Sequence, residues 1–118
     1  MPLPAAARCE RPVFSENLHL EVSVLYLVHM QVGIPAGTNS AELERLQGEE
    51  RAFSHQLQNE GKWRHLWRVT GEFANYSVFD VESHDELHTL LTSLPLYPFM
   101  TSVHVTPLAR HPSAVRPD

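Results

Sequence analysis

Residues 63–81, WRHLWRVTGEFANYSVFDV, contain two apolar runs separated by Gly71 and Glu72. Both runs are rich in aromatic and β-branched residues, which is typical of strands, and a glycine between such runs is typical of a hairpin turn. We therefore predict a hairpin of strands 63–70 and 73–81. Alternation along paired strands divides its side chains between two faces. One face has Trp63, His65, Trp67, Tyr76 and Val78, and the other has Arg64, Leu66, Arg68, Asn75, Ser77 and Phe79.

A helix is predicted before the hairpin. Asn39 or Ser40 can start it, with Glu42 placed as in a capping box, and Gly61 can end it. Its apolar residues recur with helical spacing. They are Leu43, Leu46, Phe53 and Leu57.

A second helix is predicted after the hairpin. Ser83 and Glu86 form a second capping box, and Pro95 and Pro98 end the helix. Four leucines share one of its faces. They are Leu87, Leu90, Leu91 and Leu94.

The remaining strands are predicted at residues 24–32 (VLYLVHMQV) and 101–106 (TSVHVT). The order strand, helix, strand, strand, helix, strand predicts an α+β, ferredoxin-like fold, with one antiparallel sheet and two helices on one face. Neither face of the hairpin is purely polar, although a sheet face open to water is expected to be so. We therefore predict that another subunit covers the helix-free face, and that the protein is an oligomer.

The composition limits the class of protein. The 118 residues suffice for one domain, and 9 Lys and Arg against 14 Asp and Glu give a net charge of −5, which disfavours nucleic-acid binding. No apolar run approaches the length of a membrane span, and no secretion signal is apparent. We expect a cytoplasmic domain at residues 24–118, preceded by a flexible extension at residues 1–23 that is an annotation artefact if translation starts at Val24.

Glu50 is the strongest candidate for catalysis. Helical spacing places it within the apolar stripe of the first helix, so it should point toward the sheet. A buried carboxylate has a raised pKa, which suits a general base. The alternative is a buried ion pair with Arg64, Arg68 or His65.

Polar residues of the hairpin are candidate partners. Arg64 or Arg68 can bind a carboxylate, and Asn75 or Ser77 can donate hydrogen bonds to an oxyanion. An ordinary cross-strand polar network is the alternative. Trp63, Trp67 and Tyr76 are aromatic residues of the kind found in cores and interfaces.

The eight histidines raise the question of a metal site. His84 and His88 are spaced as zinc ligands on a helix, but Asp85 stands where the zinc-protease motif has glutamate, and no third ligand is evident. We predict no metal site.

Four segments resemble the muconolactone Δ-isomerase family. Residues 58–68 (QNEGKWRHLWR) resemble its EGxWRHLWR block, and residues 74–81 (ANYSVFDV) match its ANYSVFDV strand. Residues 94–100 (LPLYPFM) and 110–113 (RHPS) are similar to its LPLFPYM and RHPS segments. The resemblance spans about residues 25–115 in the same order.

The resemblance implies an enzyme of the β-ketoadipate pathway of catechol degradation. It converts muconolactone to 3-oxoadipate enol-lactone without cofactor or metal, and assembles as a homodecamer of dimers. We assign proton transfer to Glu50, with Tyr76, His65, Asn75 and Ser77 as candidate hydrogen-bond donors. Arg64, Arg68 and Trp67 are candidate substrate-binding residues. The two hairpin faces can share one pocket only if a neighbouring subunit contributes, so some of these assignments conflict.

His29 departs from the family, in which the resemblance implies lysine or arginine at this position. If this side chain binds substrate, the histidine predicts binding that depends on pH near neutrality.

Other functions stay open. A relative that isomerises or dehalogenates chlorinated or methylated muconolactones is one alternative, although the match at Tyr76 favours the unsubstituted substrate. A non-catalytic module that binds a small acid is a second alternative, and a cofactor-independent monooxygenase is a third.

Overall fold

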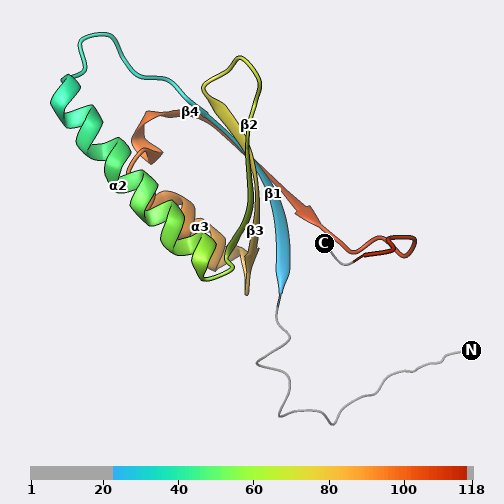
Figure 1. Ribbon diagram of the computed structural model, residues 1–118. Helices are drawn as coiled ribbons and strands as arrows, with labels where there is room; N and C mark the ends of the chain where they lie inside the picture. The colour runs from blue at the N-terminus through green and yellow to red at the C-terminus, as the bar shows by residue number, and fades with distance from the viewer. Residues whose placement is uncertain (1–22, 117–118) are drawn as a thin grey trace, which may run out of the picture.

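A computed structural model describes residues 23–116 of the chain. The elements are β1 (Val24–Val32), α2 (Ser40–Asn59), β2 (Trp63–Arg68), β3 (Ala74–Val81), α3 (His84–Thr92), the 3₁₀ turn Tyr97–Phe99 and β4 (Met100–Leu108). The strands form one antiparallel sheet in the order β2-β3-β1-β4. Both helices cover the same face of this sheet (Figure 1). The predicted ferredoxin-like fold is confirmed.

Side-chain caps fix where the two helices begin. The Asn39 Oδ1 accepts a hydrogen bond of 2.9 Å from the Glu42 N–H, and the Ser83 Oγ accepts one of 3.1 Å from the Glu86 N–H. Each cap satisfies an N–H that has no partner within its helix. Gly61 follows α2 with φ 83°, a left-handed conformation that glycine adopts without strain. The predicted helix boundaries at these three residues are therefore confirmed.

The hairpin turn is longer than predicted. The strands end at Arg68 and resume at Ala74, and a 2.9 Å bond from the Val69 N–H to the Ala74 carbonyl closes the loop. Gly71 has φ 82° and lies inside this loop. The predicted two-residue turn at Gly71 and Glu72 is therefore wrong.

A β-bulge at the start of β2 exchanges the faces of Trp63 and Arg64. Trp63 pairs with Phe79 and His65 with Val78, so β2 has one more residue than β3 in this interval. Trp63 is consequently 3% exposed in the core, while Arg64 forms a 2.9 Å ion pair with Asp80. The predicted faces of these two residues are wrong, because simple alternation fails at a bulge.

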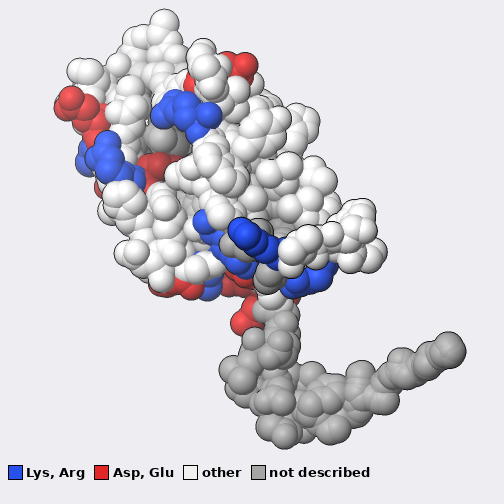
Figure 2. Space-filling view, turned by 45° about the vertical axis from the view of Figure 1, so that its right-hand side comes forward, with Lys and Arg blue, Asp and Glu red and all other residues white. Residues whose placement is uncertain are grey.

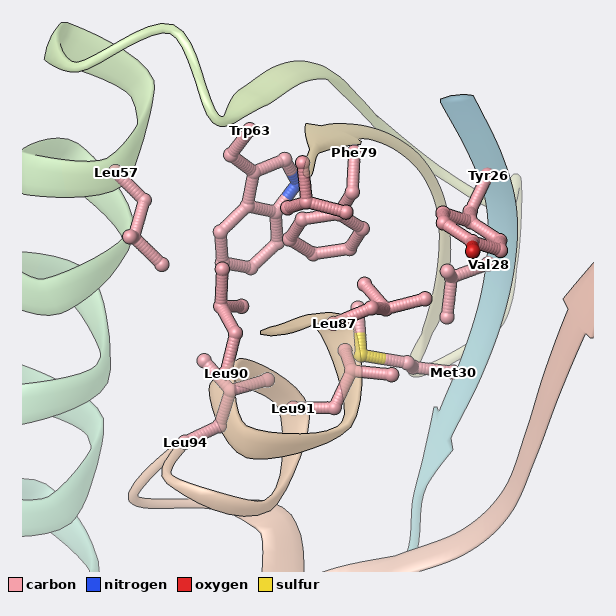
Figure 3. Close-up of a cluster of buried hydrophobic side chains, with 11 residues drawn as sticks. Tyr26, Val28, Met30, Leu57, Trp63, Phe79, Leu87, Leu90, Leu91 and Leu94 are labelled. Atoms are coloured by element: carbon pink, nitrogen blue, oxygen red, sulfur yellow. The ribbon is translucent and has the colours of Figure 1, made fainter. Parts of the chain in front are cut away.

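The core lies between the sheet and the two helices, and α3 contributes more of its side chains than α2 (Figure 3). The four leucines predicted for the second helix are all buried there, together with Val28 and Phe79. In α2, by contrast, only Ser54 and Leu57 are buried. Because α2 packs less closely than α3, space for a cavity is left beside it.

The predicted bounds are correct for the first strand and too short for the last. β1 has the predicted bounds, whereas β4 extends past the predicted Thr106 to Leu108. Pro107 is tolerated because β4 is an edge strand, where a missing N–H breaks no ladder. The predicted extension comprises residues 1–23, of which residues 1–22 lie outside the described residues. Between residues 23 and 116, no helix has the length and apolarity to cross a membrane.

Candidate active site

A cavity of about 560 Å³ lies between α2 and the helix-side face of the hairpin. Figure 2 shows a hollow with acidic atoms inside it and basic side chains on either side. Glu50 contributes a carboxylate from α2, and Arg68 and Asn75 face the same space from the hairpin. The other lining residues are Val32, Gln47, Arg51, Ser54, His55, Gln58, Trp63, Leu66, Phe73, Ala74, Leu96 and Met100. We refer to this space as the Glu50 cavity.

Glu50 is half-buried, as its place in the helical stripe predicts. Its Oε1 accepts a 3.0 Å hydrogen bond from the Leu96 N–H, in the segment between α3 and β4. Burial raises the pKa of the Glu50 carboxyl above its ordinary value, and the Leu96 hydrogen bond partly opposes this rise. Within residues 23–116 no ion pair involves Glu50, so the alternative interpretation, a buried ion pair with Arg64, Arg68 or His65, is not supported there. Glu50 therefore combines a fixed position with a carboxyl that gains protons readily.

The raised pKa of Glu50 predicts a pH-dependent effect of Glu50→Gln on stability. A raised folded-state pKa favours the protonated carboxyl, so its stabilising contribution is present at low pH and is lost as pH rises through that pKa. The glutamine side chain does not titrate. We therefore expect the stability of the variant relative to wild type to increase as pH rises from the acid range to neutrality. Urea unfolding at several pH values measures this difference, and a difference independent of pH would contradict it.

Asn75 faces Glu50 from the opposite wall with a defined orientation. The Ser77 hydroxyl, which is fully buried, donates a 2.7 Å hydrogen bond to the Asn75 Oδ1. Because the amide oxygen is engaged, the amide N–H₂ group is the part of Asn75 that is available as a donor. Ser77 does not line the cavity, so its contribution to the site is to orient Asn75.

Arg68 supplies positive charge on the hairpin side of the cavity. Its guanidinium lies 5.4 Å from the centre of the Phe73 ring, a cation–π contact within the cavity lining. An arginine fork in this position can bind a carboxylate through two parallel hydrogen bonds. Of the two arginines predicted as carboxylate ligands, Arg68 lines the Glu50 cavity and Arg64 does not.

The other predicted site residues lie on the helix-free face of the sheet. His65 stacks on Trp67 with ring centres 4.9 Å apart, and His29 lies 4.7 Å from the Tyr76 ring. His29 and Tyr76 line a separate hollow of about 270 Å³ together with Leu27, His104 and Thr106. Strand alternation thus separates these residues from Glu50 by the thickness of the sheet. Within one chain they do not share a cavity with it.

Several residues of α2 line the cavity although they are not among the predicted site residues. They are Gln47, Arg51, Ser54, His55 and Gln58. Their spacing of three or four residues is the available signal, because it marks a polar row that runs beside the apolar stripe. The Leu96 N–H was also not selected, because a backbone donor leaves no residue-type signal.

No metal site is formed by the part of the chain that is described. No group of three or more His, Cys, Asp or Glu side chains lies close enough to hold an ion there. His84 and His88 are both exposed on α3.

The fold and the cavity define a ferredoxin-like domain with a carboxyl of raised pKa in a cavity of the size that small molecules occupy. The sequence model for muconolactone delta-isomerase matches residues 24–114. The muconolactone Delta-isomerase of Cupriavidus pinatubonensis is 57% identical over 93 residues, which are 79% of this chain and 100% of that protein. The chain therefore belongs to the muconolactone delta-isomerase family.

Further comparisons agree with this assignment. The muconolactone Delta-isomerase of Acinetobacter baylyi is 48% identical over 95 residues, covering 80% of this chain and 98% of that protein. A crystal structure of muconolactone isomerase superimposes with a TM-score of 0.75 at 46% identity, covering 80% of this chain and 97% of that chain. These comparisons confirm the predicted family, fold and enzyme class.

Proposed function

We propose that Glu50 carries out both proton transfers by which this chain, an isomerase of the muconolactone family, moves the double bond of its lactone. The carboxylate removes the γ-proton of muconolactone and becomes protonated, while charge develops on the lactone carbonyl oxygen. The same carboxyl then returns a proton to the α-carbon, which gives 3-oxoadipate enol-lactone. The number of protons is conserved, and Glu50 returns to its carboxylate form.

The position of Glu50 is the observation that carries this proposal. It is half-buried, has a raised pKa and faces a cavity of about 560 Å³ that is open to solvent on one side and has room for a small lactone. A carboxyl with these properties accepts and returns a proton more readily than one in water.

The opposite wall supplies the interactions that a dienolate needs. The Asn75 amide, oriented by Ser77, is the candidate donor to the developing oxyanion. Arg68 is the candidate ligand for the carboxymethyl group. We do not include Arg64, His65, Trp67, Tyr76 or His29 in the cavity of their own chain, since they lie on the other face of the sheet.

An absorbance assay with muconolactone and its 5-chloro analogue tests the substrate preference. Faster turnover of the unsubstituted lactone is expected from the family assignment. Faster release of chloride from the analogue would favour the dehalogenating relative. Absence of turnover with measurable binding of either lactone would favour a non-catalytic acid-binding module.

We also infer that the helix-free face binds another copy of the chain. Trp67 is 56% exposed on this face, and Tyr76 and Leu108 are exposed too. Exposed aromatic residues gathered on a sheet face are typical of subunit contacts. The resemblance to the family extends this inference to dimers that assemble into a decamer. The single cysteine is compatible with the reducing cytoplasm in which we expect the protein to act.

Replacing Trp67 by glutamate is expected to weaken this assembly. A charge buried without a partner at the contact opposes association, while the exposed position spares the fold of the single chain. Sedimentation velocity should show a shift from large particles toward the 13.4 kDa chain. His88→Glu, on the exposed surface of α3, is the control and should leave the mass unchanged. Equal assembly of wild type and the Trp67 variant would reject this face as the contact.

A further inference from the structure

We propose that Arg51 is a second substrate-binding arginine, which together with Arg68 holds the substrate carboxylate from opposite walls of the Glu50 cavity. This inference rests on the proposed function, and it adds a residue and an orientation for the bound lactone. Arg51 follows Glu50 directly on α2, and both residues line the cavity.

The two arginines come from different elements, and both line this cavity. Arg51 belongs to α2 and Arg68 to the end of β2, and both side chains are exposed. Figure 2 shows basic side chains on both sides of a hollow and acidic atoms between them. Because Arg51 and Arg68 are exposed while Glu50 is half-buried, the positive charge lies at the rim of the cavity and the Glu50 carboxylate lies deeper.

Arg51 and Arg68 differ in their ion pairing from the other lysines and arginines between residues 40 and 68. Arg45 pairs with Glu42 and Glu49, Lys62 with Glu86 and Arg64 with Asp80. Over the described residues, neither Arg51 nor Arg68 has an acidic partner. The basic charges that remain unneutralised in the sheet and helices thus converge on the Glu50 cavity.

This placement predicts how the lactone lies in the cavity. The carboxymethyl group is the negatively charged part of muconolactone, so it should lie at the rim between the guanidinium groups. The uncharged ring then extends inward toward Glu50 and Asn75. Contacts from two walls restrict rotation of the substrate more than a single arginine can, which helps to hold the γ-carbon near the base.

The test compares an acid substrate with its neutral counterpart. Turnover of muconolactone and of its methyl ester is measured for wild type, Arg51→Gln and Arg51→Lys. We expect Arg51→Gln to raise KM for the acid about tenfold or more, with a smaller change in kcat and little effect on the ester. The lysine variant should recover part of the loss because it keeps the charge but not the fork. Arg45→Gln, on the exposed surface of the same helix, should leave kcat and KM unchanged for both substrates.

The inference is overturned if Arg51→Gln affects the acid and the ester by the same factor, or affects neither. A binding measurement separates this outcome from failure of the proposed function. Calorimetry measures the affinity for muconolactone of Glu50→Gln and of the double variant Glu50→Gln/Arg51→Gln. This measurement does not depend on turnover. The double variant should bind about tenfold more weakly or worse, and equal affinities would exclude Arg51 as a ligand whatever the role of Glu50.

Discussion

Glu50→Gln is expected to lower kcat for muconolactone by about 10²- to 10⁴-fold, the usual contribution of a positioned acid–base group. Glutamine has nearly the same shape, and its carbonyl oxygen can still accept the hydrogen bond from the Leu96 N–H. It cannot accept the γ-proton or return a proton to the α-carbon. The loss should therefore appear mainly in kcat, with a small change in KM.

Glu49→Gln is the matched control for this variant. Glu49 is the adjacent carboxylate of α2, but it is exposed and pairs with Arg45 at 2.6 Å. Its removal should change kcat less than twofold, because exposed ion pairs contribute little. A Glu50 variant with nearly wild-type turnover would reject Glu50 as the base, and an equal loss in both variants would point to a general effect of charge on α2.

Phe79→Ala is expected to lower the free energy of unfolding by about 3–5 kcal/mol, as is typical of large-to-small changes in a core. Phe79 is fully buried, and its ring centre lies 4.7 Å from that of Trp63. Because small domains are stable by only about 5–15 kcal/mol, this change should remove a large part of the stability. Urea unfolding at a fixed protomer concentration measures the effect, since assembly also contributes to stability.

Phe73→Ala provides the comparison at an exposed position. Phe73 is 41% exposed near the hairpin turn and contacts Arg68. Its loss should cost about 1 kcal/mol or less, because little apolar surface is returned to water. Equal destabilisation by the two substitutions would contradict the position of the core between the sheet and the two helices.

The predictable part of the fold rests on local signals. Asn39, Gly61 and Ser83 marked helix ends correctly because capping depends on residues within one turn. The bulge at Trp63 and Arg64 was missed because it depends on how β2 aligns with β3. The extension of β4 through Pro107 depends on its place at the sheet edge, which the sequence of that strand does not reveal.

The candidate site was likewise predictable only where local patterns in the sequence determine the position of a residue. Helical periodicity was sufficient to direct Glu50 toward the sheet, and strand alternation placed Arg68 and Asn75 on one face. Arg51 borders the apolar stripe and resembles an ordinary surface residue until the cavity beside α2 is known. The hydrogen bond from Leu96 joins residues 46 positions apart in the chain, so tertiary structure alone brings them together.

The pH dependence of kcat/KM for muconolactone tests the role of Glu50 most directly. Since burial raises the pKa of this carboxyl and the base must be ionised, kcat/KM should fall on the acid side with a midpoint above the ordinary glutamate value. The residual activity of Glu50→Gln should lack this acid limb. An acid limb that persists unchanged in Glu50→Gln, or a wild-type profile that stays flat through the acid range, would contradict proton transfer by Glu50.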